Sequence, residues 1–145
     1  MILSYFDSSI LLSILLDEER QKEAYKYWQN PLRVSSILLK IETVTTLRRI
    51  FENNKRNLSS GWLTEKIKTM DEYLATVNFM AVNDRIEREI YSKKELAQCR
   101  SLDAIHIATA LQFREIANNE ETNLFTFDKT MLALAERYEF RTNRL

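Results

Sequence analysis

Residues 100–111 read Arg-Ser-Leu-Asp-Ala-Ile-His-Ile-Ala-Thr-Ala-Leu, and this stretch is the most informative in the chain. Ile105, Ala108 and Leu111 recur at the spacing of one helical face, so we expect a helix over residues 101–116 that packs this face into a core. The first turn of that helix carries Asp103. A carboxylate so close to a core is costly unless it is exposed or paired with another group.

Three further acids stand at comparable junctions. Asp7 follows the apolar run 2–6, Asp128 follows the apolar run 124–127, and Glu42 lies at the head of a predicted helix. Four acids far apart in sequence, each at an element boundary, suggest one shared acidic pocket suited to a divalent metal. The alternative is that each acid caps a helix, because Asp is a preferred capping residue. The residues alone leave both interpretations open.

Strand-like and helical patterns alternate along the chain. We expect strands at residues 2–6, 32–36, 79–82 and 124–127, and the tail 140–145 can add a last extended piece. We expect a first helix after Ser8 and Ser9, which can cap it, and a second helix through residues 24–28. Further helices are expected over residues 37–51, from Gly61 onward, after Asn83 or Asp84, and over residues 101–116 and 129–138.

This alternation predicts an α/β fold, with a short parallel β-sheet flanked by helices on both sides in a three-layer α/β/α arrangement. We expect residues 1–145 to form a single domain. The functional crevice of such a sheet lies outside the carboxyl ends of its strands, where Asp7 and Asp128 fall.

Apolar spacing also predicts helix faces. The core face of the first helix is Ile10, Leu11, Ile14 and Leu15, and the apolar residues of the second are Ala24, Tyr25 and Trp28. In the helix 37–51, one side is expected to carry Leu38, Ile41, Val44, Thr45 and Ile50.

Composition narrows the class of protein. One Gly and one Pro disfavour an all-β sandwich and exclude a Gly-rich phosphate loop. The single cysteine, Cys99, excludes an internal disulfide and a thiolate metal cluster, and we expect a half-buried thiol. No apolar run approaches the roughly 20 residues of a membrane helix, and the start of the chain shows no signal-peptide pattern. We therefore expect a cytoplasmic protein that does not enter a membrane.

Formal net charge is zero, with 21 basic and 21 acidic residues, which is unusual for a nucleic-acid binder. If the charges of four acids are neutralised by a bound metal, 17 acids remain against 21 basic residues, which is an excess of four positive charges. The candidate phosphate contacts are Arg48, Arg49, Lys55, Arg56, Lys93, Lys94 and Arg100. Taken one at a time, these side chains are better explained as solvated helix faces.

A site of carboxylates and water suits Mg²⁺ or Mn²⁺ and the hydrolysis of phosphodiesters, because the metal lowers the pKa of a bound water. Because the metal itself activates the water, such a site needs no histidine as a general base. His106, the only histidine, lies three residues after Asp103 and could reach the pocket, but we favour a buried imidazole hydrogen-bonded to a neighbour.

Two hydroxyl groups stand close to the acids in sequence. Ser9 and Thr126 lie two residues from Asp7 and Asp128, so they could orient a carboxylate or a metal-bound water. A helix cap for Ser9 and a strand-face hydroxyl for Thr126 are equally acceptable explanations.

Four segments in order, residues 5–9, 42–49, 100–111 and 124–128, resemble the motifs of PIN-domain ribonucleases, particularly VapC-type toxins of bacterial toxin–antitoxin pairs. The resemblance implies that the catalytic acids are Asp7, Glu42, Asp103 and Asp128. Mg²⁺ or Mn²⁺ would be held through Asp7, Asp103 and Asp128 with Glu42 close by, and Ser9 and Thr126 would be supporting polar groups.

The resemblance further implies metal-dependent endonucleolytic cleavage of RNA, inhibition by a cognate antitoxin, and a homodimer. The chain departs from many relatives at residues 138–141, which lack the Gly-containing turn that leads into a final strand. The competing functions are a non-catalytic PIN-like module that binds RNA or protein and, less favoured, a Mg²⁺ phosphoesterase acting on small phosphates.

Overall fold

The structure is a computed structural model that describes residues 2–16, 18–118 and 120–143. Five strands form one parallel sheet in the order β3-β2-β1-β4-β5. The strands are β1 (Leu3–Phe6), β2 (Arg33–Ser36), β3 (Asn78–Met80), β4 (Thr122–Phe125) and β5 (Arg141–Thr142). The chain leaves β1 toward β2 on one side, whereas β4 and β5 lie on the other, so the switch point of the sheet falls between β1 and β4.

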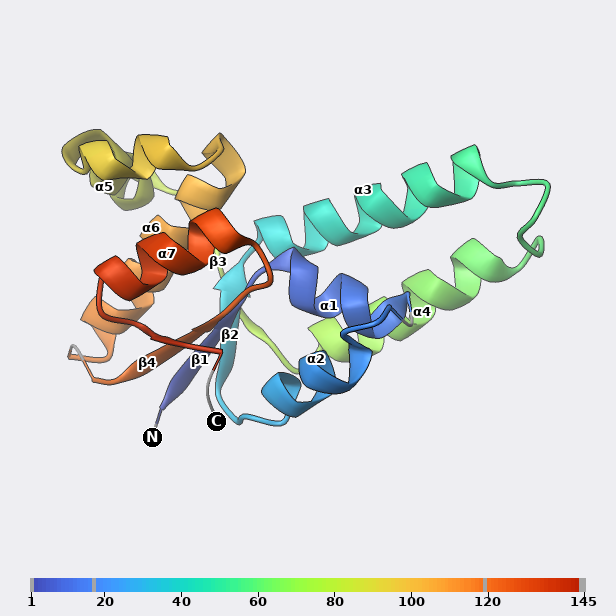
Figure 1. Cartoon of the computed structure of the whole chain (residues 1–145), viewed down its shortest axis with the longest axis horizontal. Helices are drawn as coiled ribbons and strands as arrows, with labels where there is room; N and C mark the ends of the chain where they lie inside the picture. Colours follow the sequence, from blue (N-terminus) through green and yellow to red (C-terminus); the bar gives the residue numbers. More distant parts are fainter. Residues whose placement is uncertain (1, 17, 119, 144–145) are drawn as a thin grey trace.

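Helices cover both faces of the sheet, and the predicted α/β/α fold is confirmed (Figure 1). The α-helices of the described residues are α1 (Ser8–Leu15), α2 (Gln21–Trp28), α3 (Leu38–Asn53), α4 (Trp62–Leu74), α5 (Asp84–Ser92), α6 (Ser101–Ile116) and α7 (Lys129–Arg137). A short 3₁₀ helix, η1 (Lys94–Gln98), which the sequence pattern did not indicate, precedes α6.

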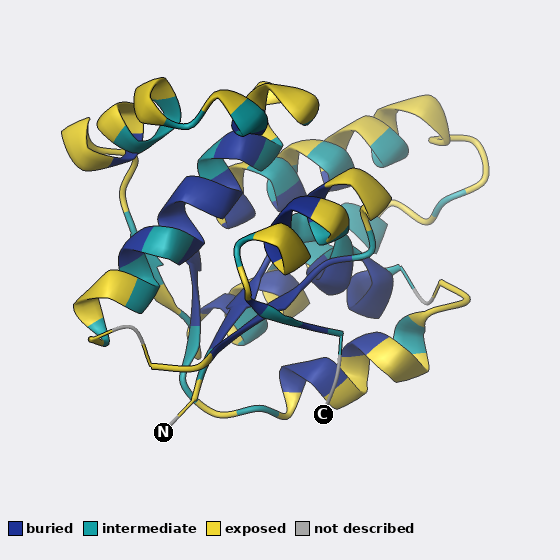
Figure 2. Cartoon of the chain, turned by 60° about the vertical axis from the view of Figure 1, so that its left-hand side comes forward, coloured by how far each residue is buried: buried dark blue, intermediate teal, exposed yellow. Residues whose placement is uncertain are grey.

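The alternation of side chains along β1 separates two apolar cores. Phe6 packs with α1, α2, α3 and α4, and its ring lies 4.7 Å from Trp28 and 5.3 Å from Phe125 between centroids. Tyr5 points to the opposite face and packs with α6 and α7. Figure 2 shows the strands buried between the two helical layers. Both faces of the central strands are therefore dry, as a parallel sheet requires.

Helices α3 and α4 run side by side and extend away from the sheet as a long arm (Figure 1). Phe51 stacks on Trp62 near the far end of this arm, at 6.3 Å between ring centroids. None of the helices within the described ranges combines the length and apolar character needed to cross a bilayer.

Two strands are shifted from their predicted positions. β4 begins at Thr122 rather than at residue 124, and β3 is Asn78–Met80 rather than 79–82. Polar groups explain the shift of β4, since Asn123 is buried and donates a hydrogen bond to Ser4 in the neighbouring strand at 3.2 Å. An apolar pattern does not detect a polar residue whose burial is offset by a hydrogen bond.

The predicted face of α3 was wrong in part. The buried residues are Leu38, Leu39, Thr43 and Leu47, whereas Ile41 is 52% exposed and Thr45 is exposed. The true face follows a row four residues apart through Leu39, Thr43 and Leu47, and a threonine in the middle of that row hides it from an apolar pattern.

Smaller corrections concern α2 and α6. Tyr25 is partly exposed, and Tyr27 instead stacks on Phe125 at 4.5 Å between ring centroids. Ile105 and Leu111 are only half-buried, because α6 lies between the sheet and α5 and its other sides are covered more completely. The bounds of α6 match the prediction.

The last strand forms although its turn lacks glycine. Glu139 adopts φ 65°, the left-handed conformation that favours glycine. Its N–H donates to Glu136 at 2.9 Å and the Phe140 N–H donates to Ala135 at 3.0 Å, which is the Schellman pattern at the end of α7. The chain then pairs Arg141 and Thr142 with β4, and the end of the predicted tail, residues 144–145, lies outside the described residues.

Replacing Glu139 by Gly should stabilise the protein, because glycine adopts the left-handed conformation without the cost of about 1–2 kcal/mol that a side chain incurs. The greater freedom of glycine in the unfolded chain offsets about 0.5–1 kcal/mol of this gain. Thermal unfolding should therefore show a higher Tm for Glu139→Gly. Arg137→Gly, inside the helix, is the control and should lower the Tm, and an equal loss in both variants would contradict the proposed strain.

Candidate functional site

The four predicted acids line one hollow of about 500 Å³ at the carboxyl edge of the sheet. They reach it from different elements, since Asp7 follows β1, Glu42 lies on α3, Asp103 lies on α6 and Asp128 precedes α7. The other residues around the hollow are Ser8, Ser9, Arg100, Ser101 and Leu102. Side chains separated by as many as 121 positions in sequence thus face the same space.

Asp7 is the most buried of the acids, at 4% exposure. It caps α1 itself, whereas the sequence had suggested Ser8 or Ser9 as the cap. One carboxylate oxygen accepts hydrogen bonds from the Ser9 N–H at 3.1 Å and the Ser9 hydroxyl at 2.5 Å. Its extended backbone at the end of a strand makes Asp7 a natural cap, since the residue just before a helix keeps non-helical angles.

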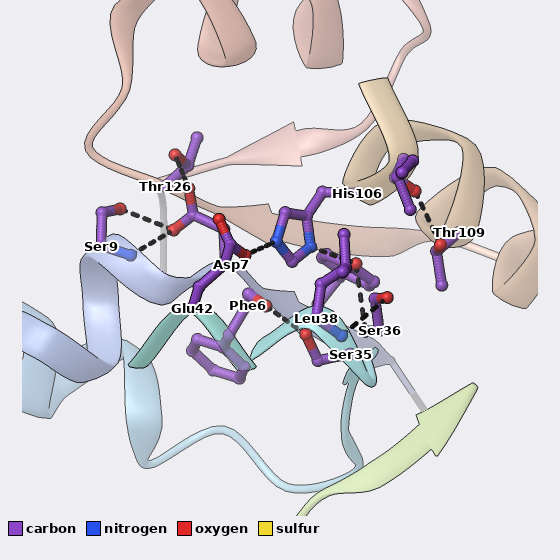
Figure 3. A network of polar contacts seen from close by, with 12 residues as sticks. Phe6, Asp7, Ser9, Ser35, Ser36, Leu38, Glu42, His106, Thr109 and Thr126 are labelled. Atoms are coloured by element: carbon purple, nitrogen blue, oxygen red, sulfur yellow. Dashed lines mark hydrogen bonds and ion pairs between the residues drawn. The ribbon is translucent and has the colours of Figure 1, made fainter. Parts of the chain in front are cut away.

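Thr126 and Ser9 connect the two strand ends. The Thr126 hydroxyl donates to the second Asp7 oxygen at 2.6 Å (Figure 3). The same hydroxyl accepts the Asp128 N–H at 3.0 Å. The Ser9 hydroxyl also accepts the Phe127 N–H at 2.9 Å. Both hydroxyls therefore fix the Asp7 carboxylate and the backbone that leads to Asp128, which is the geometry expected of supporting groups.

The capping explanation holds for two of the acids and fails for the other two. Asp128 is exposed and caps α7 by accepting the Met131 N–H at 2.8 Å. Glu42 and Asp103 lie inside α3 and α6, whose N-terminal caps make no side-chain hydrogen bond. Asp103 lies in the first turn of α6, where an acid suits the helix dipole, whereas no such local preference accounts for Glu42, and the hollow is the feature that the two carboxylates share.

His106 is buried and hydrogen-bonded, as the sequence predicted, and its partners are Tyr5 and Glu42. Its Nε2 lies 2.5 Å from Glu42 Oε1 and its Nδ1 lies 2.6 Å from the Tyr5 hydroxyl. The Tyr5 oxygen also accepts the Ser36 N–H at 3.1 Å. Burial raises the pKa of the Tyr5 phenol far above its ordinary value, so this hydroxyl keeps its proton.

The crowding of acids alters their protonation. Burial raises the pKa of Asp7, and His106, Ser9 and Thr126 only partly oppose this effect. Burial also raises the pKa of Asp103, and the negative charges of Asp128 and Asp7 raise it further. Cys99 beside them is half-buried, and burial together with Asp103 and Asp128 raises the pKa of its thiol to about 11.

The donor set fits a hard divalent cation. Carboxylate oxygens are the ligands that Mg²⁺ and Mn²⁺ prefer, and a cation would relieve the repulsion that raises the Asp103 pKa. Within the described residues, no three acidic, imidazole or thiol groups are drawn together closely enough to hold an ion as they stand. Like charges repel, and Asp7 and Asp128 are engaged by the bonds above, so binding would require the side chains to close in.

Arg100, one of the candidate phosphate contacts, lines the hollow and is exposed. Two others are engaged on helix surfaces, since Lys55 pairs with Glu52 at 2.9 Å and Lys93 pairs with Glu89 at 2.6 Å. Surface ion pairs of this kind contribute about 0–1 kcal/mol. The solvated-face explanation therefore suits these two lysines, and Arg100 is the cation placed to meet an anionic ligand.

Comparison with known families adds independent information. Residues 4–137 match the PIN domain. The chain belongs to the PIN domain family. This match covers most of the 145 residues and includes all four acids. Among curated proteins, no sequence matches the chain.

Solved structures share the fold at low sequence identity. A toxin–antitoxin complex from Klebsiella pneumoniae aligns with a TM-score of 0.64 and 18% identity over 90% of each chain. VapBC-1 from nontypeable Haemophilus influenzae aligns with a TM-score of 0.57 and 13% identity over 97% of this chain and 96% of the other. A Pyrobaculum aerophilum protein aligns with a TM-score of 0.57 and 15% identity over 91% and 84%.

The sequence did not single out Tyr5 or Ser36, which hold His106 in place. A signal for Tyr5 does exist, because a tyrosine inside a strand buried on both faces needs a hydrogen-bond partner. The identity of that partner depends on the packing of α6 and is not encoded locally.

We expect Asp103→Asn to stabilise the metal-free protein at neutral pH. The folded-state pKa of Asp103 lies above its ordinary value of 3.8, so ionisation destabilises the folded state. This penalty is full above the folded-state pKa and disappears as pH falls toward the ordinary value. Thermal unfolding in a chelating buffer should show a Tm gain of a few degrees at neutral pH that vanishes in acid.

Asp71→Asn on the exposed face of α4 is the matched control and should leave the Tm nearly unchanged. A gain for Asp103→Asn that persists at low pH would contradict the electrostatic explanation.

Proposed function

We propose that this PIN-domain protein is a Mg²⁺- or Mn²⁺-dependent endoribonuclease and the toxin of a toxin–antitoxin pair. The observation that carries the proposal is the meeting of Asp7, Glu42, Asp103 and Asp128 at one hollow. The family match supports it, because the matched residues 4–137 contain all four acids.

In the proposed reaction Asp7, Asp103 and Asp128 would hold the cation, which when bound would supply Lewis-acid chemistry toward water and the scissile phosphate. Glu42 faces the same hollow, so its carboxylate would lie close to the cation and add negative charge to the site. Arg100 at the rim contributes positive charge for a phosphate of the RNA backbone. Thr126 and Ser9 keep the Asp7 carboxylate oriented.

The proposed partner is an antitoxin protein, and a small reading frame just upstream of the gene is expected to encode it. The structural neighbours support this part, since one is a toxin–antitoxin complex and another is VapBC-1. We further propose that the protein acts in the cytoplasm, where its RNA substrate would be found.

Asp7→Asn should reduce cleavage of RNA by more than about 100-fold in the presence of Mn²⁺, because loss of an outer-shell partner alone costs about 10–100-fold. The measurement is the initial rate of cleavage of a labelled total-RNA pool by purified protein, with and without chelator. Asp71→Asn removes an acid from a different surface and should retain the parental rate.

Equal cleavage by the parent and Asp7→Asn would overturn the nuclease proposal. Retention of RNA by both proteins without cleavage would favour the non-catalytic module. Hydrolysis of small phosphate esters without RNA cleavage would favour the phosphoesterase.

We also propose that the chain forms a homodimer through the apolar surface between α5 and α6. Val82 is 46% exposed and Tyr91 is 81% exposed, beside a hollow of about 580 Å³ that Ile86, Ile90 and Ile105 help to line. Exposed apolar side chains gathered in this way are typical of protein interfaces.

Sedimentation analysis should give a dimer for the parent and a monomer for Tyr91→Glu, because a charge in an apolar interface is not compensated. Arg88→Glu on the same helix is exposed but lines a different, polar hollow, and it should leave the dimer intact. A monomeric parent protein would contradict the proposed interface.

A further inference from the structure

The Glu42 carboxylate is held from behind by a buried relay. His106 is 1% exposed, its Nε2 lies 2.5 Å from Glu42 Oε1, and its Nδ1 lies 2.6 Å from the Tyr5 hydroxyl (Figure 3). The Tyr5 oxygen in turn accepts the Ser36 N–H at 3.1 Å. The relay therefore runs from the backbone of β2 through β1 and α6 to the carboxylate on α3.

The relay has a defined direction of donation. Because the Tyr5 oxygen accepts the Ser36 N–H, its own O–H is available to donate to His106 Nδ1. Nδ1 is then an acceptor, and the imidazole proton resides on Nε2, from which it is donated to Glu42. A carboxylate can only accept, so this assignment suits the neutral imidazole, and the two contacts together fix the orientation of the ring.

Glu42 needs such a contact more than Asp7 and Asp128 do. Asp7 is fixed by hydroxyl and backbone donors from neighbouring residues, and Asp128 is fixed by its cap. Glu42 has a longer and more flexible side chain and lies just past the first turn of α3, where its neighbouring backbone N–H groups are used within the helix. Among the described residues, the imidazole of His106 is the one hydrogen-bond donor found at its carboxylate.

The relay engages only one Glu42 oxygen, and Glu42 still lines the hollow. His106 itself does not line the hollow. It stands one helical turn after Asp103, so a single turn of α6 presents Asp103 to the hollow directly and holds Glu42 through His106.

We propose that His106 is a positioning residue that orients the Glu42 carboxylate toward the divalent cation and touches neither the cation nor the RNA. This inference rests on the proposed metal-dependent function. It assigns a role to a buried imidazole that the hydrolysis itself does not use.

The test replaces His106 by two amides of different length, Gln and Asn, whose nitrogens occupy the positions of different imidazole nitrogens. The amide nitrogen of Gln falls near the position of Nε2 and can donate to Glu42, whereas the shorter Asn reaches only the Nδ1 position and meets Tyr5. His106→Asn should weaken Mn²⁺ binding about 10–100-fold, the range typical of a lost outer-shell partner. His106→Gln should bind Mn²⁺ within a few-fold of the parent, and calorimetric titration with Mn²⁺ alone measures both.

A double variant shows whether the effect of His106 on Mn²⁺ binding acts through Glu42. Glu42→Gln alone should weaken Mn²⁺ binding, and adding His106→Asn to it should weaken binding little further, because residues that act through one contact are not additive. Thr122→Val changes a buried residue at the start of β4, whose hydroxyl donates to the Glu120 carbonyl, and should leave Mn²⁺ affinity unchanged.

Tyr5→Phe provides a second test of the relay that does not depend on the folding of the His106 variants. It keeps the ring but removes the hydroxyl that fixes Nδ1, and should weaken Mn²⁺ binding less than His106→Asn does. Melting of each metal-free variant verifies the fold before titration. If His106→Asn unfolds, parental affinity in Tyr5→Phe would overturn the proposal, and measurable weakening there would support it.

Other outcomes separate this inference from the nuclease proposal. Equal Mn²⁺ affinity for the parent, Asn and Gln proteins would overturn the positioning role, as would equal weakening by Asn and Gln. A parent that binds Mn²⁺ but does not cleave RNA would overturn the nuclease proposal alone, and the positioning role would still be decided by the affinities. A parent that does not bind Mn²⁺ would overturn both.

Discussion

The hydrogen bond from Thr126 to Asp7, at 2.6 Å, joins the carboxyl ends of the two central strands, and the candidate site depends on it. Its geometry follows from the register of the sheet, in which Phe6 pairs with Phe125. The residues that follow these two positions leave the sheet side by side, one into α1 and the other toward α7. A shift of this register by one residue would turn Phe6 and Phe125 away from their shared core, so apolar packing protects the polar contact above it.

The site is therefore a place where local rules are broken and the surroundings compensate. Four carboxylates face one hollow, and burial and mutual repulsion raise the pKa of Asp103. The aromatic core below, where Phe6 contacts Trp28 and Phe125, supplies apolar burial on the same strands. Functional sites of this kind commonly sacrifice stability that the rest of the fold provides.

Much of this arrangement could be predicted from the sequence, and the reason is that the signals are local. The helix 101–116 is bounded by its own periodicity, and Asp7 is marked by an apolar strand that stops abruptly. The alternation of strands and helices then fixes a parallel sheet, whose carboxyl edge must gather such residues.

What could not be predicted depends on contacts between distant segments. Thr43 lies in the buried row of α3, and Asn123 extends β4, because each meets a partner segment that no local pattern reveals. The turn at Glu139 substitutes a strained glutamate for the expected glycine and is held by hydrogen bonds to α7. The Tyr5–His106–Glu42 relay joins three elements and leaves no motif in any one of them.

Cys99 gives the acidic cluster a chemical reporter. A thiol with a pKa of about 11 is almost entirely protonated at neutral pH, so it reacts slowly with alkylating agents and oxidants. Part of that inertness comes from the charges of Asp103 and Asp128. Neutralising those charges would lower the thiol pKa in part, burial being the larger cause, so the alkylation rate of this single cysteine is expected to respond to the charge state of the neighbouring carboxylates.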